Sequence, residues 1–248
     1  ADSFISKFNP NGTKEWTRLL GSAVEDQGNA LTTGSDGSIY IAGSTYGNLD
    51  GRTNNGTADS FISKFNPNGT KEWTILLGTS SLLSGEALTT GSDGSIYIAG
   101  YTFGDLDGKT YNGQADAFIS KFNPDGTKVW TSVFGTSSWD GGDALTTGSD
   151  GSIYVTGETY GDMDGQTNNG ARDAFISKFN PDGTKVWTRL LGSTNEFHGD
   201  ALTTGSDGSI YLAGYGFSDL NGQTNNGLFD AFISKFNPDG SKEWTRLV

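Results

Sequence analysis

The sequence predicts an all-β protein made of repeated four-stranded antiparallel sheets. Two observations carry this prediction: a strict internal repeat, and short apolar segments joined by glycine-containing turns within each repeat. The motif FISKFNP begins at residues 4, 61, 118, 175 and 232, always 57 residues apart, and no copy carries an insertion or deletion. Such strict register indicates that each unit packs against its neighbours in one repeated geometry.

The strands of one repeat follow from residues 116–157. DAFISKF (116–122) and KVWTSVF (128–134) are rich in aromatic and β-branched residues and flank the turn NPDGT. ALTT (144–147) and SIYVTG (152–157) flank the turn GSDGS. Asp-Gly turns between strands favour hairpins, so each repeat holds two hairpins. No segment shows the sustained 3.6-residue apolar period of a helix.

Four strands in a period of this length are typical of one blade of a β-propeller. Phe118 and Phe122 lie on one face of the expected sheet and Ile119 on the other. Stacking blades face to face buries both sets, at about 25 cal/mol per Å² of apolar surface. We expect a propeller, which leaves only short protected edges, and keep an open linear stack of the same sheets as the alternative.

We interpret the chain as one tandem-repeat domain, 1–248. It divides into an outer hairpin of an incomplete blade (1–20) and four repeats, residues 21–77, 78–134, 135–191 and 192–248. The chain begins without Met and at an arbitrary phase of the repeat. We therefore expect a processed chain or a segment of a longer array.

Composition excludes several partners. Lys and Arg number 16 against 29 Asp and Glu, a net charge of −13, which argues against nucleic acids and anionic membrane surfaces. No run of 18 apolar residues occurs, so no membrane insertion is expected. The absence of cysteine rules out disulfides, thiolate nucleophiles and Cys-ligated zinc.

The block DAFISKFNPDGTKVWTSVFG, followed by GGDALTTGSDGSIYVTGET, resembles the SBBP-type β-propeller repeat of bacterial surface and secreted proteins. The resemblance covers the whole chain, and one departure from it is the polar insert GDLDGKTYNGQAD, where many such repeats are shorter. It implies a propeller fold with ALTT and SIYIAG as inner strands and DAFISKF and KEWTRLL as outer strands. It also implies an extracellular or cell-surface location, and it implies no enzymatic reaction.

With that assignment the chain holds five outer hairpins and four inner ones, so it cannot close neatly as a five-bladed ring. Either four blades close and hairpin 1–20 is displaced, or the hairpin pairs with another chain, or the segment belongs to a longer array. We favour the last two, and predict a structural or assembly module that pairs with copies of itself by blade or strand, as in a filament.

The polar insert follows the pattern D-x-D-G-x-T-x-N-G-x-x-D, with Asn replacing Asp at Asn48 in the first copy and at Asn221 in the last. Oxygen ligands two residues apart, with glycine forming a tight turn, suit calcium. The alternative is an Asx-turn loop without metal. The candidate metal ligands are Asp50, Asn55, Asp59, Asp105, Asp107, Asn112, Asp116, Asp162, Asp164, Asn169, Asp173, Asp219, Asn226 and Asp230.

The copies differ most in the connection after the tryptophan strand, and loops on a rigid scaffold commonly carry recognition. Exposed aromatic residues beside Asp would suit a glycan or a surface protein, which is the alternative function. The other reading is that these loops vary because they do nothing. The candidate ligand-binding residues are Leu82, Leu83, Trp139, Asp140, Phe197 and His198.

The sequence predicts that the protein is not an enzyme. His198 is the single histidine, and no GxSxG nucleophile motif occurs. A glycosidase needs one pair of carboxylates with divergent environments, whereas near-identical repeats supply equivalent ones.

Overall fold

The computed structural model describes residues 1–248 and contains eighteen strands. No helix in it is long and apolar enough to span a bilayer. The strands are β1 (Ser3–Phe8), β2 (Lys14–Leu20), β3 (Asp26–Thr33), β4 (Ile39–Thr45), β5 (Asp59–Phe65), β6 (Lys71–Leu77), β7 (Leu83–Thr90), β8 (Ile96–Thr102), β9 (Asp116–Phe122), β10 (Lys128–Phe134), β11 (Asp140–Thr147), β12 (Ile153–Thr159), β13 (Asp173–Phe179), β14 (Lys185–Leu191), β15 (Phe197–Thr204), β16 (Ile210–Gly216), β17 (Asp230–Phe236) and β18 (Lys242–Leu247).

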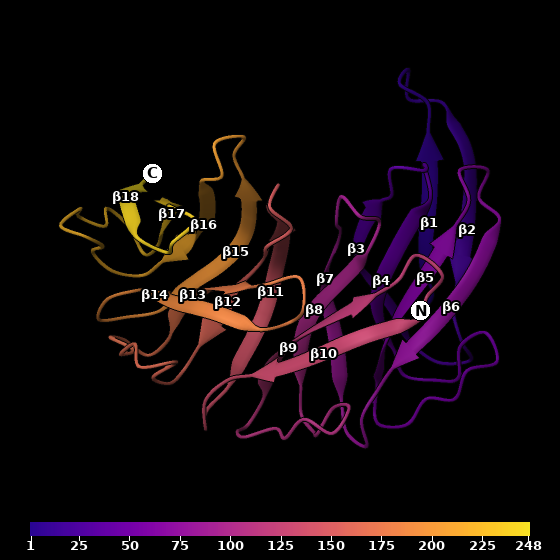
Figure 1. Ribbon diagram of the computed structural model, residues 1–248, viewed down its shortest axis with the longest axis horizontal. Coiled ribbons are helices and arrows are strands. Elements are labelled where there is room, and N and C mark those ends of the chain that lie inside the picture. The colour runs from indigo at the N-terminus through magenta and orange to yellow at the C-terminus, as the bar shows by residue number, and fades with distance from the viewer.

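The strands form one two-stranded sheet, β1–β2, and four four-stranded sheets. We call the latter blade 1 (β3–β6), blade 2 (β7–β10), blade 3 (β11–β14) and blade 4 (β15–β18). Neighbouring strands within each blade run antiparallel, which confirms the predicted sheets. The blades follow one another in an open arc with β1–β2 and blade 4 at opposite ends (Figure 1). The arrangement is therefore the open stack of propeller blades.

Tight turns set the hairpin geometry. Between β5 and β6, the N–H of Gly69 donates to the carbonyl of Asn66 at 2.8 Å, and the N–H of Asn66 donates to the carbonyl of Thr70 at 2.8 Å. Gly69 adopts a φ of 80°, a conformation that a residue without Cβ reaches at no steric cost. The NPxG sequence thus folds locally into the turn that joins each outer pair of strands.

Side chains alternate along the outer strands, so that each outer strand inside the arc packs in two interfaces, one with the preceding sheet and one with the next. Phe61 and Phe65 face the β1–β2 hairpin and pack in a cluster with Ile5. Ile62, between them, faces the opposite way and packs in a cluster with Phe118 of blade 2. Both faces of a blade are therefore core, as the apolar pattern predicts.

The strands β3, β7, β11 and β15 contact one another and form the inner edge of the arc. Each carries a β-bulge between a glycine and an alanine, for example between Gly142 and Ala144. A bulge leaves one extra residue unpaired and turns its side chain out of the regular alternation. These extra residues are Asn29, Glu86, Asp143 and Asp200.

Candidate ligand-binding rim

One rim of the arc carries an aromatic side chain directly after the second strand of every blade. The four residues occupy the same position of the repeat and are between 37% and 42% exposed. They are Tyr46, Phe103, Tyr160 and Phe217. The fold therefore sets a row of half-exposed rings at the point where each polar insert begins.

Between blades 2 and 3 these rings join a continuous contact chain. Tyr101 packs edge-on against Phe103, with ring centroids 5.8 Å apart, and lies 5.6 Å from the ring of Trp139. Trp139 in turn packs edge-on against Tyr160 at 5.8 Å. We call Phe103, Tyr101, Trp139 and Tyr160 the aromatic band.

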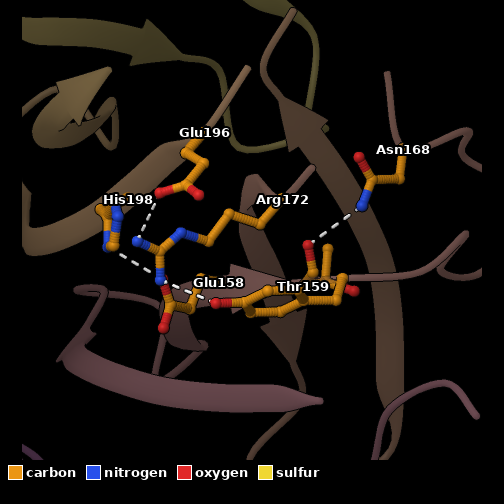
Figure 2. Close-up of polar contacts among 7 residues, drawn as sticks. Glu158, Thr159, Asn168, Arg172, Glu196 and His198 are labelled. Carbon is orange, nitrogen blue, oxygen red and sulfur yellow. Dashed lines mark hydrogen bonds and ion pairs between the residues drawn. The ribbon is translucent and has the colours of Figure 1, made fainter. Parts of the chain in front are cut away.

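Next to the band lies a charged cluster of Arg172, Glu158, Glu196 and His198 (Figure 2). The guanidinium of Arg172 lies 5.5 Å from the ring centroid of Tyr160. Arg172 Nη1 donates to Glu158 Oε2 at 2.7 Å and to the Tyr160 hydroxyl at 3.0 Å, while Nη2 donates to Glu196 Oε2 at 2.9 Å. The Nδ1 atom of His198 lies 2.8 Å from the same Glu158 oxygen.

Backbone pairing between blades brings these side chains together. The segment before β13 forms a parallel bridge with the segment before β15, at Arg172 and Glu196. The equivalent bridge between blades 2 and 3 joins Ala115 and Trp139. One repeated backbone geometry thus presents a charged pair at one boundary and the aromatic band at the next.

The side chains of the cluster are partly buried, and burial shifts some of their pKa values. Burial raises the pKa of Glu158 although Arg172 acts against that change. Burial also raises the pKa of the bulge residue Asp143 to about 7, with the charges of Glu158, Glu86 and Asp200 adding to the effect. A carboxyl group in this inner edge therefore holds its proton near neutral pH.

The pKa of His198 shifts in the opposite direction, downward. Burial, together with the charge of Arg172, lowers the pKa of its imidazole to about 4, and Glu196 opposes this. Its Nε2 atom is buried without a hydrogen-bond partner, and the ring stacks on Tyr215 with centroids 4.3 Å apart. Burial and Arg172 thus favour the neutral imidazole, which packs on Tyr215 and lies within hydrogen-bonding distance of Glu158.

A cavity of about 480 Å³ opens beside the band. Its lining residues are Gln114, Ser138, Trp139, Glu158 and Tyr160. Two aromatic residues, one acidic residue, one amide residue and one serine thus line one space. Ligand pockets combine these groups, apolar faces for contact and a few polar groups for orientation.

Of the predicted ligand-binding residues, some lie at the rim and others are buried between the blades. Trp139 lies in the band, His198 lies in the charged cluster, and Leu82 is half-buried. Leu83, Asp140 and Phe197 were expected on an exposed loop, but each is 0% exposed. They are the first residues of β7, β11 and β15, so alternation turns their side chains inward.

The predicted calcium loop makes its own hydrogen bonds. Asp107 pairs with Lys128 and accepts a hydrogen bond from Thr131 on β10, and the matching contacts recur at Asp50 and Asp164. Other predicted ligands accept backbone N–H groups within the loop. These are Asp59, Asp105, Asp116, Asp162, Asp173, Asp219 and Asp230.

The Asn residues of that set lie in the same loop. Asn55, Asn112, Asn169 and Asn226 donate those N–H groups to the last aspartate of each insert. No group of three or more His, Asp and Glu side chains converges as a metal site. The structure thus gives these residues a structural use, and calcium binding by the insert stays a prediction.

The sequence prediction missed Arg172, Glu158 and Tyr160. For Arg172 and Glu158 the signal is a copy-specific substitution outside the variable connection: Arg172 stands where the two preceding repeats have Ala58 and Ala115. Comparing all copies position by position, rather than only in the loops, would have found it.

The SBBP β-propeller repeat matches residues 15–50, and the β-propeller domain of unknown function DUF5122 matches residues 34–72, 91–128 and 148–185. The regulatory protein FlaEY of Caulobacter vibrioides is 28% identical over 169 residues, covering 61% of this chain and 18% of its own. The chain spans about a fifth of the length of the curated relatives it matches.

Solved structures share the fold at low identity. An α-L-arabinofuranosidase from Fusarium graminearum superposes with a TM-score of 0.54 at 9% identity, covering 88% of this chain and 65% of its own. A gluconolactonase from Xanthomonas campestris superposes with a TM-score of 0.50 at 15% identity, covering 96% of this chain and 66% of its own. These neighbours contradict the prediction that the protein is not an enzyme. Enzymes are built on this fold, so repeated carboxylates and a single histidine do not exclude catalysis.

Proposed function

Because the chain belongs to the SBBP-type β-propeller repeat family, we propose that it acts as a ligand-binding propeller whose ligand is a neutral carbohydrate. The observation that carries this proposal is the cavity of about 480 Å³ that is lined by Trp139 and Tyr160 together with Glu158 and Gln114. Aromatic faces pack against the C–H faces of sugar rings, and carboxylate and amide groups hydrogen-bond to hydroxyls.

The charges of the site favour a neutral ligand. Arg172 packs against Tyr160 of the band, and its guanidinium is already bonded to Glu158 and Glu196. The net charge of −13 further disfavours an anionic ligand through long-range repulsion. Hydroxyl groups, which carry no charge, can share the lone pairs of Glu158 without displacing Arg172.

The test is calorimetric titration with neutral oligosaccharides, chosen from a glycan array, on the wild-type protein and on Trp139→Leu. Leucine is the residue at the equivalent position of the preceding repeat, Leu82, so the variant keeps a side chain that this backbone accepts. We expect at least a tenfold loss of affinity, about 1.4 kcal/mol.

The matched control is Val129→Ala, on the exposed part of an outer strand, which should bind like the wild type. Absence of binding to every neutral oligosaccharide, or unchanged affinity in Trp139→Leu, would contradict the proposal.

A second candidate is self-association, as the repeat pattern predicts. One end of the arc exposes Phe4 and Phe8, and beside them lies an apolar groove of about 310 Å³ lined in part by Trp16, Leu31 and Ile39. Inside the arc the equivalent surface is covered by the neighbouring repeat. We therefore propose a second copy of this chain as the occupant, joined as blades are joined within the arc.

Light scattering after size-exclusion chromatography tests this candidate. The wild type should form concentration-dependent oligomers, and the double variant Phe4→Ser/Phe8→Ser should be monomeric. A monomeric wild type at all concentrations would contradict it. An extracellular or cell-surface location is part of the same proposal, and cell fractionation is its test.

A further inference from the structure

Two buried carboxylates lie side by side beneath the aromatic band. Asp116 is the first residue of β9 in blade 2, and Asp140 is the first residue of β11 in blade 3. Both are 0% exposed. The parallel bridge between Ala115 and Trp139 holds them together, since the N–H of Asp140 donates to the carbonyl of Ala115 at 2.8 Å.

The carboxylates converge over a glycine. A Cβ placed on Gly135 would lie 2.8 Å from Asp116 Oδ1 and 2.8 Å from Asp140 Oδ2. Any other residue at position 135 would collide with both groups. The chain thus places one oxygen of each acidic side chain, Asp116 Oδ1 and Asp140 Oδ2, against the same glycine at the boundary between two blades.

Each carboxylate has one oxygen without a partner. Asp140 Oδ2 accepts from the Thr136 N–H at 2.6 Å and from the Thr136 hydroxyl at 2.9 Å. Asp116 Oδ2 accepts from the Asn112 N–H at 3.0 Å. The Oδ1 atoms of both aspartates are buried with no hydrogen bond. Two neighbouring buried carboxylates that are both charged are strongly unfavourable, so the pair is stabilised by a proton held on one of them or by a cation bound between them.

We propose that Asp116 and Asp140 bind a divalent cation of the calcium class at the boundary of blades 2 and 3. Calcium takes only oxygen ligands and accepts carboxylates, carbonyls and water in flexible geometry. Thr102 and Thr159 lie opposite the two aspartates in the sheet register, and their buried hydroxyl groups donate to the carbonyls of Gly104 and Gly161. The proposal does not depend on carbohydrate binding.

The repeats supply an internal comparison. In the neighbouring boundaries the second carboxylate is replaced, by Leu83 beside Asp59 and by Phe197 beside Asp173. The hairpin at the end of the arc repeats the pair as Asp2 and Asp26, but there Asp2 is exposed to solvent. The fully buried pair is therefore specific to one boundary of an otherwise repeated scaffold.

The test compares thermal unfolding at pH 8, with calcium chloride or with chelator, in the wild type and in Asp140→Leu. Leucine at this position is native to the preceding repeat, so the variant should fold. Calcium at about 100 times its Kd should raise the wild-type midpoint by about 5 °C. The rise should be lost in Asp140→Leu and in the isosteric Asp140→Asn.

Terbium provides a second readout, since Trp139 precedes Asp140 and can sensitise its luminescence. The signal should appear with the wild type and fall at least tenfold with Asp140→Asn. Superposed wild-type melts with and without calcium would overturn the proposal, as would an equal response in the variants. A midpoint that rises on acidification but not with calcium would assign a shared proton to the pair instead.

Discussion

Phe4 and Phe61 occupy the same position of the same pentapeptide, FISKF, yet Phe4 is 66% exposed and Phe61 is 0% exposed. Their strands, β1 and β5, pair with β2 and β6 in the same register. The difference is the neighbour: Phe61 packs against Ile5 of the adjoining hairpin, whereas nothing in the described chain covers Phe4. Contact between repeats, not local sequence, therefore decides which apolar side chains are buried.

This relationship predicts unequal effects of one substitution at two identical sites. Phe61→Ala should lower the free energy of unfolding by about 3–5 kcal/mol, because it opens a cavity between blade 1 and the hairpin. Phe4→Ala should lower it by less than about 1 kcal/mol, because the ring is already in water. Urea denaturation of both variants is the measurement. Similar losses in the two variants would mean that stacking of blades is not the main stabilising contact.

The repeat made most of this architecture predictable. A fixed period, NPDG and GSDG turns and alternating apolar residues predict the four strands of each blade and their two buried faces. The boundaries of the third strand were not predictable. It was expected at 144–147 but runs over Asp140–Thr147, because Gly141 and Gly142 suggest a loop while their backbone pairs with β12.

The late start that was expected for this strand also explains why three predicted ligand-binding residues are buried. Once β11 begins at Asp140, that side chain and its equivalents Leu83 and Phe197 face the interior rather than the rim. Arg172 and Glu158 could not be paired from sequence, since their contact depends on how blade 3 and blade 4 lie against each other. Trp139 could be singled out because it differs from its counterparts within a variable segment.

The charged cluster should behave as one unit. Arg172→Ala should lower the free energy of unfolding by about 2 kcal/mol, because it leaves Glu158 and Glu196 close together without a counter-charge. Adding Glu158→Ser should restore much of this loss, since the first repeat carries Ser44 and Ala58 at these two positions.

A double-mutant cycle measured by denaturation tests this coupling. We expect an interaction free energy of about 1–2 kcal/mol between positions 158 and 172. Additive effects of the two substitutions would show that Arg172 contributes by packing on Tyr160 rather than by its charge.

His198 should make the protein sensitive to mild acid. Its pKa falls from 6.5 to about 4 on folding, so the native state binds fewer protons than the unfolded chain between those values. The resulting stability is fully present above pH 6.5 and is lost as the pH falls toward 4, by roughly 2–3 kcal/mol. His198→Gln, which copies Gln27 of the first repeat, should lose less stability over this range.

NMR can follow this titration directly, because the chain has one histidine. Two contacts of the imidazole act in opposite directions: Glu158 at 2.8 Å favours its protonation, while burial and Arg172 disfavour it. We expect the latter to dominate, because Arg172 already neutralises Glu158. A titration midpoint near or above 6.5 would show that the ion pair with Glu158 dominates instead.

Asp143 should give the opposite pH dependence. Its pKa rises on folding from 3.8 to about 7, so the native state holds a proton that the unfolded chain releases. The associated stability is full below about pH 4 and is lost as the pH rises through 7. Asp143→Asn, which copies Asn29, keeps the hydrogen-bonding shape without the charge and should be more stable than the wild type at pH 8.

The Asp143 side chain is only half-buried at the inner edge. Solvent screening therefore reduces the expected gain in free energy of unfolding for Asp143→Asn to about 1–2 kcal/mol. Denaturation of both proteins from pH 4 to pH 8 is the measurement, and the difference in free energy of unfolding should grow steadily with pH. If the difference were independent of pH, the effect would come from packing of the amide. The charges of Glu158, Glu86 and Asp200 would then not act on Asp143, and the inner edge could not hold a protonated carboxyl at neutral pH.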